Sequence, residues 1–431
     1  MREIAHPSTL AFHDPAETSP SWFKRLTGWA TPSALVSLLA GALTAFTISL
    51  VGEMPLGELV LVATAGWAAL CAALNRRVPG ALFTSRWFLV MLACQLVALV
   101  AYIGSDLYRQ SEPRDMARGW ARMIFLGIDL IAITYLLSCS RKNLMFLIVG
   151  QALGEIVRTY TVGPLFGDFW KFGVGGPLTY GVLVVGSLGG PFLAMLGAAV
   201  MGVVHFLLDY RSVGAICVLL AALLAVQRLP RAVRLWALPL GLALALAGAM
   251  GVYQHTTEEA GGRRTTRSDV DRGSMIQAAV EAVVESPFIG HGSWFSNSDV
   301  YDNFLQIRSD AAKLAGIGGF VGPNAEVETT SIHSQILVAL AEGGVFGGAF
   351  FLAFALGLAR TGWVLVLRSA WSFESATYLL LLLFGVTNLF FSPFSGAHRV
   401  YISMAAGLVL LVLTHPVRDP APAVTATEGG V

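Results

Sequence analysis

The chain has 431 residues, of which 55% are hydrophobic and only 13% are charged, and its mean hydropathy is +0.67. Soluble domains carry about 25% charged residues, so this composition excludes an ordinary soluble protein. The formal net charge of +1 does not suggest a nucleic acid as partner. The four cysteines all fall in apolar runs and form no Cys-x-x-Cys pair, which argues against a disulfide framework or a cysteine metal site.

Apolar runs long enough to cross a hydrocarbon layer of about 30 Å recur along most of the chain. We therefore expect an all-α, polytopic membrane protein with about twelve transmembrane helices. The expected spans are 33–52, 57–75, 86–104, 121–139, 143–159, 177–189, 191–208, 211–228, 234–253, 333–359, 372–391 and 398–414. The sixth and seventh are alternatively one broken helix, because the glycine-rich GSLGGPFLAMLG separates them.

Lysine and arginine are concentrated in alternate connections, which predicts that both termini are cytoplasmic. Residues 1–30 then form a cytoplasmic segment that is retained, because the first apolar run is too long for a signal peptide. Residues 31–253 hold nine helices, residues 333–415 hold three, and residues 416–431 form a disordered cytoplasmic tail. The polar stretch 254–332 becomes one large periplasmic loop.

This loop contains SMIQAAVEAVVE, whose spacing predicts an amphipathic helix. Its apolar face is expected to hold Met275, Ile276, Ala279, Val280, Val283 and Val284, and its polar face Gln277, Glu281 and Glu285. The loop is therefore expected to be partly helical, and long folded loops tend to carry function.

Two arginines need an explanation. Arg211 begins the eighth predicted helix, with Asp209 close enough to be its partner, and a snorkelling side chain is the plain alternative to a site. Arg272 directly precedes the predicted loop helix, beside Asp269 and Asp271. A solvated charge is the plain interpretation there, although the free N–H groups at a helix start also attract anions.

His333 follows Thr329, Thr330 and Ser331, which are good N-cap residues, so we expect it in the first turn of the tenth span. The positive end of the helix dipole disfavours imidazolium, and the neutral ring is the form that accepts a proton. A polar residue at a capped helix start is the alternative. Glu342 lies further along this span, so we expect it to have a polar partner or to face the protein interior.

Three stretches together resemble the O-antigen ligase and polysaccharide polymerase superfamily of bacterial envelope glycosyltransferases. HSQILVALAEGGVFGG, which starts at His333, is similar to the family's histidine motif with its later Glu and glycines. RGSMIQAAVEAVVESPFIGHG resembles an arginine followed by Pro and Gly-x-Gly, here Arg272, Pro287, Gly290 and Gly292. YRSVGAICVLL is similar to the arginine start of the helix that precedes the large loop.

The resemblance covers about Asp209 to Gly348, and two positions depart from it. Ile276 stands where the family often has Trp, and Tyr210 where a Ser often precedes the arginine. Neither departure removes a proposed catalytic group, so both leave the chemistry intact and the choice of substrate open.

The resemblance implies a GT-C-like enzyme in the bacterial cytoplasmic (inner) membrane, with its active site facing the periplasm. Such an enzyme moves a polyprenyl-diphosphate-linked glycan onto the hydroxyl of a lipid or glycan acceptor, and it needs no metal or other cofactor. His333 would be the general base, Arg211 and Arg272 would bind the diphosphate, and Glu342 would support His333. The implied partners are this donor, the acceptor and membrane lipids, with no nucleic acid.

Three alternatives remain at this point. A polymerase that extends lipid-linked repeats would need the same residues as a ligase. A secondary transporter of this size commonly shows two related halves, and none are visible here. A metal-dependent glycosyltransferase would use acidic residues of the first outer loop, where only Glu53 and Glu58 are available.

Overall fold

The computed structural model describes residues 31–49, 52–74, 80–164, 168–259, 263–293, 298–314, 333–368, 372–392 and 396–414. Apart from one short hairpin, all regular structure in these ranges is helical, which confirms the all-α class. The two expected cytoplasmic end segments, 1–30 and 416–431, lie outside the described residues.

The chain builds its helices in the following order. The first group is α2 (Pro32–Leu43), α3 (Leu56–Ala73), α4 (Arg86–Arg109), α5 (Pro113–Cys139) and α6 (Asn143–Thr161). A π-helical turn, η2 (Trp170–Val174), leads to α7 (Gly175–Leu188), α8 (Pro191–Leu207), α9 (Arg211–Gln227) and α10 (Arg231–Glu259). Then come α11 (Arg263–Glu285), α12 (Ser298–Leu314), α13 (Gln335–Gly347), α14 (Ala349–Trp363), η4 (Val364–Arg368), α15 (Ser375–Phe391) and α16 (Gly396–Thr414).

Four of the described helices are long and apolar enough to cross a membrane, namely α3, α4, α5 and α14 continued through Arg368. Six others, α2, α8, α9, α13, α15 and α16, are apolar but shorter. These helices identify a membrane protein, while the expected number of about twelve spans is not confirmed. The glycine-rich sequence after α7 separates two helices, so the alternative of one broken helix is wrong.

The first predicted span, 33–52, is wrong in its second half. Helix α2 ends at Leu43, and the chain then forms a hairpin in which β1 (Thr47–Ser49) pairs antiparallel with β2 (Glu53–Pro55). The β-branched Thr47 and Ile48 favour an extended backbone, and β2 leads directly into α3.

The tenth predicted span, 333–359, is two helices rather than one. The chain breaks at Gly344, whose φ of 65° and ψ of −165° lie outside the helical region, and α14 starts afresh at Ala349. Glycine adopts a positive φ at little cost, so a run of four glycines within six residues favours a break where apolar periodicity alone predicted continuity.

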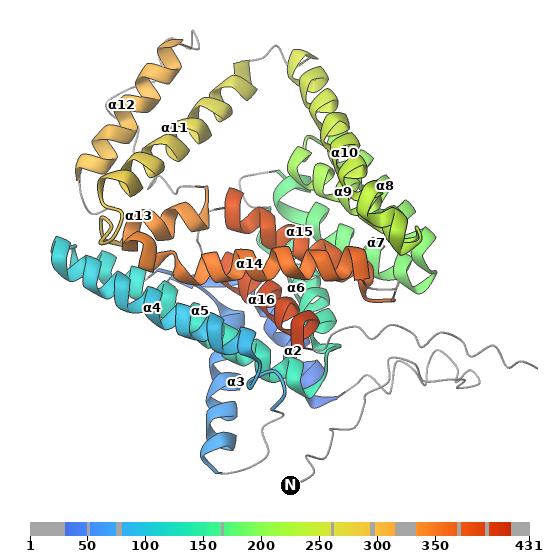
Figure 1. Cartoon of the computed structure of the whole chain (residues 1–431), viewed down its shortest axis with the longest axis horizontal. Coiled ribbons are helices and arrows are strands. Elements are labelled where there is room, and N and C mark those ends of the chain that lie inside the picture. Colours follow the sequence, from blue (N-terminus) through green and yellow to red (C-terminus); the bar gives the residue numbers. More distant parts are fainter. Residues whose placement is uncertain are drawn as a thin grey trace, which may run out of the picture.

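The core of the bundle lies around α14 and α16, which cross in the middle of Figure 1. Phe350, Phe351 and Phe354 of α14 are fully buried, and α16 packs against α5, α14 and α15. Helices α2 and α6 approach closely because Gly41 and Gly154 carry no side chain, and a Cβ at either would collide with backbone atoms of the facing helix. Small residues at contacts of this kind are typical of membrane helices.

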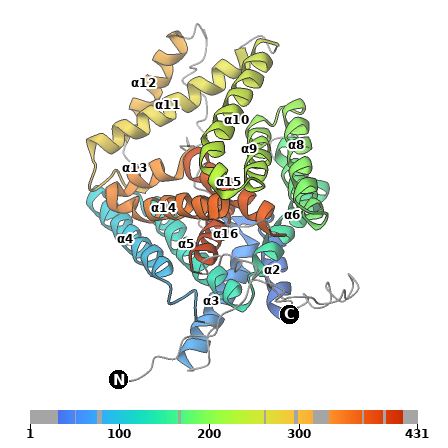
Figure 2. The same ribbon diagram turned by 45° about the vertical axis from the view of Figure 1, so that its right-hand side comes forward.

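The expected loop 254–332 is largely helical where it is described. Helices α11 and α12 stand side by side away from the bundle in both Figure 1 and Figure 2, and the end of α10 rises on the same side. Helix α11 starts at Arg263, so it is longer than the predicted amphipathic segment. Its Glu281 accepts a hydrogen bond from Asn303 of α12 at 2.8 Å, which ties the two helices together.

The predicted apolar face of α11 is only partly correct. Ala279 and Ala282 are buried against Val338 and Ala341 of α13. Three larger residues assigned to the same face are exposed, Ile276 by 40%, Val280 by 45% and Val284 by 74%. The alanines form the contact because small side chains let two helices approach, a criterion that hydrophobicity alone does not capture.

Candidate active site

The segment Ser286–Ser293, here called the strap, joins α11 to the broken end of α13. His291 N–H donates to the carbonyl of Ala341 at 2.9 Å, and Gly292 N–H donates to that of Glu342 at 3.0 Å. Val345 N–H, which would donate to Ala341 in an unbroken helix, donates instead to the carbonyl of Pro287 at 2.8 Å. The break at Gly344 therefore frees carbonyls of α13, and the strap satisfies them.

Three glycines of the family-like motifs make this docking possible. Gly290, Gly292 and Gly344 have φ values of 82°, 83° and 65°, which side chains rarely tolerate. A Cβ at Gly290 would also collide with the carbonyl of Glu342, and one at Gly344 with the carbonyl of Phe288. The Pro-x-x-Gly-x-Gly spacing thus encodes the shape of a backbone junction.

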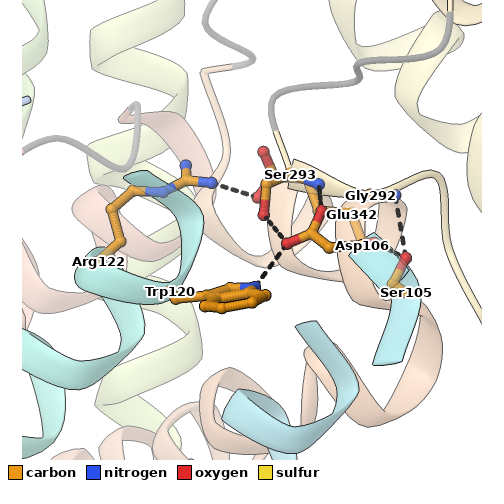
Figure 3. A network of polar contacts seen from close by, with 7 residues as sticks. All are labelled: Ser105, Asp106, Trp120, Arg122, Gly292, Ser293 and Glu342. Carbon is orange, nitrogen blue, oxygen red and sulfur yellow. Dashed lines mark hydrogen bonds and ion pairs between the residues drawn. The ribbon is translucent and has the colours of Figure 1, made fainter. Parts of the chain in front are cut away.

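Buried polar side chains fasten the strap to α4 and α5 (Figure 3). Asp106 of α4 accepts hydrogen bonds from Ser293 N–H at 2.6 Å, Ser293 Oγ at 2.8 Å and Trp120 Nε1 at 2.7 Å. The neighbouring Ser105 Oγ accepts from Gly292 N–H at 3.0 Å and donates to the carbonyl of Glu342 at 2.8 Å. Three donors therefore converge on one buried side chain and hold the strap against α4 and α5.

Glu342 has the polar partner that its place in an apolar helix requires. Its Oε2 lies 2.6 Å from Nη2 of Arg122 in α5, and the two side chains are only 1% and 7% exposed. The expectation of a partner or an interior position is confirmed. An orienting role toward His333 stays a prediction, because the observed ion pair directs this carboxylate to α5.

His333 lies just before α13 rather than in its first turn. The N-cap is Ser334, whose Oγ accepts from Leu337 N–H at 3.4 Å and lies 3.5 Å from the carbonyl of Leu389 at the end of α15. The three cap residues expected from the sequence, Thr329, Thr330 and Ser331, lie outside the described residues. Hydroxyl side chains abound in this stretch, so the sequence alone did not identify which one caps the helix.

The pKa of His333 is lowered from its usual value of 6.5, first by burial and then by the positive charge of Arg272. A helix dipole would shift the pKa in the same direction, but the causes in the structure are desolvation and a neighbouring cation. A neutral imidazole near pH 7 is ready to accept a proton.

Arg272 therefore lies close to His333, but not where the sequence placed it on its helix. Helix α11 begins nine residues earlier, at Arg263, so Arg272 is inside the helix and has no free N–H groups beside it. Its side chain is exposed, and within the described residues it makes no hydrogen bond or ion pair.

A second histidine, His398, was missed by the sequence analysis. It lies in the first turn of α16 and is close enough to His333 for the charge of one to affect the other. The next residue, Arg399, makes a buried bidentate ion pair with Glu58 of α3 at 2.9 and 2.8 Å. This pair fixes the start of α16, and a charged residue inside a predicted span was the signal that could have found it.

Arg211 is the first residue of α9, as the sequence predicted. Its Nε donates to Oδ1 of Asp209 at 2.9 Å, so the expected partner is confirmed. Asp209 is 58% exposed and Arg211 22% exposed, so the pair lies at the surface, where such bonds contribute little to stability. The structure thus brings His333 and Arg272 together, whereas Arg211 begins a different helix.

In the part of the chain that the structure describes, no three His, Cys, Asp or Glu side chains lie together so as to hold a metal ion. Of the two carboxylates considered for a metal site, Glu58 is instead bound to Arg399.

No curated protein matches this sequence significantly. Residues 196–352 match the family model described as O-antigen ligase. The matched segment runs from α8 into α14 and contains Arg211, Arg272, His333 and Glu342. This match supports the membership of the chain in the O-antigen ligase superfamily.

Proposed function

We propose that the protein is an O-antigen ligase-like glycosyltransferase that moves a glycan from polyprenyl diphosphate to an acceptor hydroxyl. Members of its superfamily are ligases and polymerases that act on lipid-linked glycans. The observation that carries the proposal is that the half-buried His333 lies near enough to the exposed Arg272 for this charge to lower its pKa. A base and an anion-binding cation side by side fit a transfer that deprotonates a hydroxyl and expels a diphosphate.

In this mechanism His333 accepts the proton of the acceptor hydroxyl while the hydroxyl oxygen attacks the anomeric carbon. The bond between that carbon and the phosphate oxygen breaks, and polyprenyl diphosphate leaves with the electron pair. Because burial and Arg272 hold the pKa of His333 below 6.5, most of the imidazole is neutral at pH 7 before the reaction. The proton taken up by His333 makes it a cation beside the departing anion.

Arg272 and Arg211 would bind the diphosphate and stabilise the charge that develops on it. Arginine forms paired hydrogen bonds with phosphate oxygens, each about 1.5–3 kcal/mol for a charged partner. Arg272 is available for this, and Arg211 would exchange its surface bond with Asp209 for the stronger anion. These cations would supply the electrostatic stabilisation that other glycosyltransferases obtain from a metal.

The active site is proposed to face the periplasm from the bacterial inner membrane. The distribution of lysine and arginine along the sequence supports this orientation, with both termini and the short basic connections inside. The region 254–332, including α11 and α12, would then form the large periplasmic part that covers His333.

Purified protein in nanodiscs, given a polyprenyl-diphosphate glycan and a core-type lipid acceptor, should transfer the glycan with a metal chelator present. A strict requirement for a divalent cation would reject the mechanism. A deletion strain would separate ligase from polymerase: a ligase defect leaves long lipid-linked glycan unattached, whereas a polymerase defect leaves single repeats on the acceptor.

A further inference from the structure

A second polar site surrounds Glu155, a carboxylate in the apolar helix α6 that the proposed mechanism does not use. Its Oε1 accepts a hydrogen bond from the hydroxyl of Tyr401 in α16 at 2.9 Å. Within the described chain, no hydrogen bond reaches Oε2. The positive charge of Arg158, three residues further along α6, also acts on Glu155. A carboxylate in a membrane helix is costly unless it is paired, so one with an oxygen that accepts no hydrogen bond is a candidate site.

Gly176 lies next to Oε2 and places no side chain against it. A Cβ added there would lie 4.0 Å from this oxygen. Tyr180 of α7 and Tyr210, the N-cap of α9, also lie close enough to Glu155 for its charge to raise the pKa of Tyr210 and to act on Tyr180. The pKa of Tyr210 is raised to about 12, first by burial and then by that carboxylate, so the phenol keeps its proton.

The glycine-rich segment next to Glu155 is held rigidly. Trp170 Nε1 of η2 donates to Nδ1 of His205 at 3.0 Å, so the hydrogen of this imidazole is on Nε2. That Nε2 is 2.7 Å from Oγ1 of Thr179, whose own hydroxyl donates to the carbonyl of Gly175 at 2.9 Å. Arg158 of α6 also donates to the carbonyl of Phe172 at 3.1 Å, which closes the segment onto the helix that carries Glu155.

The Glu155 site adjoins both groups of proposed catalytic residues. Tyr401 follows His398 by three residues on α16, so the two side chains share one face of the helix, and His398 interacts with His333. On the other side, Tyr210 directly precedes Arg211. Glu155 therefore lies between the helix that approaches the base and the helix that begins with an arginine.

We propose that Glu155, with Tyr401 and Tyr210, binds a neutral sugar ring of the acceptor and selects against anionic sugars. This inference rests on the proposed function. A carboxylate accepts hydrogen bonds from two sugar hydroxyls, and phenols add donors and flat apolar surface. The negative charge would repel a diphosphate, so the donor occupies the arginines and the acceptor takes the carboxylate side. Glu155 is then a specificity residue, not a catalytic one.

The Glu155→Gln variant keeps the size of the side chain and an acceptor for Tyr401 but removes the charge. We expect the KM for a neutral acceptor to rise about tenfold or more, with the KM for the donor unchanged. Tyr401→Phe should raise it less. Matched controls are Glu374→Gln and Tyr378→Phe, a carboxylate and a phenol before and in the first turn of α15, and both should leave the acceptor KM unchanged.

Direct binding separates this proposal from the proposed function. Saturation-transfer NMR with methyl hexopyranosides and methyl hexosiduronates should show the neutral sugars preferred by the wild type, and the preference lost in Glu155→Gln. Equal preference in the variant and the wild type would overturn the proposal, as would a change in the donor KM alone. If the wild type transferred no glycan but kept this preference, only the transferase mechanism would fail. If Glu155→Gln does not fold, Tyr401→Phe decides by the same measurement.

Discussion

The strap and the surroundings of His333 are both places where α11 meets α13 or the residues that flank it, yet they differ in their polar groups. At the strap, Asp106 is 0% and Glu342 1% exposed, and each carboxylate is bound to buried donors. Near His333, Arg272 is exposed and its guanidinium has no bonded partner among the described residues. Satisfied groups build a scaffold, whereas unsatisfied ones at a surface are available to a substrate.

This difference divides the family-like motifs into two kinds of residue. Pro287, Gly290, Gly292 and Gly344 shape the junction between the strap and α13, so they determine where α11 lies. The position of α11 in turn places Arg272 beside His333. Variants of the strap should therefore lower stability first, and variants of the site should lower turnover with the fold intact.

The largest effect is expected for His333→Ala. Loss of a general base typically lowers a rate by about 10²–10⁴-fold. Among the residues that the structure describes, His333 has no hydrogen bond that its loss would remove. Glycan transfer and thermal unfolding should be measured together. Full turnover in the variant would show that His333 is not the base. An equally large loss of stability would show that His333 acts mainly in holding the fold.

Removing one partner of the buried pair between Arg122 and Glu342 should cost about 3–5 kcal/mol of unfolding free energy, because the other charge is left alone. Arg122→Met and Glu342→Leu should each be destabilising, and the double variant should recover much of the loss. The unfolding free energies of the wild type, the two single variants and the double variant, measured in detergent, form a double-mutant cycle. Additive losses would mean that the two charges do not stabilise each other.

Asp106→Asn should have a smaller effect of the same kind, about 1–3 kcal/mol, because the amide cannot accept all three hydrogen bonds. Hydrogen exchange of the strap should increase more than that of α14. A suitable control is Asp115→Asn, since Asp115 contacts Arg118 at 3.8 Å at the partly exposed start of α5. Equal exchange in both variants would show that the strap does not depend on Asp106.

Arg272→Gln should shift the pH dependence in a defined direction. The pKa of His333 in the folded protein is lowered, so most of the imidazole becomes protonated, and unable to act as a base, only at a pH below 6.5. The same shift contributes stability that is present above pH 6.5 and is lost as pH falls toward the folded-state pKa. Without the Arg272 charge the pKa rises, so the acid limb of transfer should move to higher pH.

The control for this shift is Arg308→Gln on the neighbouring α12, which should leave the acid limb in place. The pH profile of kcat is the readout, because it reports the base with substrate bound. An unchanged or lowered apparent pKa in Arg272→Gln would separate Arg272 from His333. A higher donor KM in the same variant would add support for diphosphate binding.

Local patterns predicted well what depends on near neighbours along the chain. The apolar runs located most helices to within a few residues, and Asp209 was recognised as the partner of Arg211 because it is two residues away. The same patterns failed at Gly344 and on α11, where a backbone junction and the fit of alanines against α13 overrode the apolar period.

The partners that complete the scaffold and the candidate acceptor site are far apart in sequence. Asp106 and Ser293 are 187 residues apart, Arg122 and Glu342 220, and Glu155 and Tyr401 246. Each charge inside a predicted span signalled that some partner must exist, because an unpaired charge among lipid tails is costly. Periodicity carries no information about which distant helix supplies that partner.

The sequence by itself determined that this is a helical membrane protein whose residues 196–352 match the O-antigen ligase family. An apolar composition indicates that the chain lies in a lipid bilayer, and the spacing of motif residues can be read directly from the sequence. Only the tertiary structure decided that α13 breaks, that Arg272 reaches His333 and that Glu155 meets Tyr401. Those contacts depend on how helices pack, and packing is a property of pairs of surfaces rather than of any one segment.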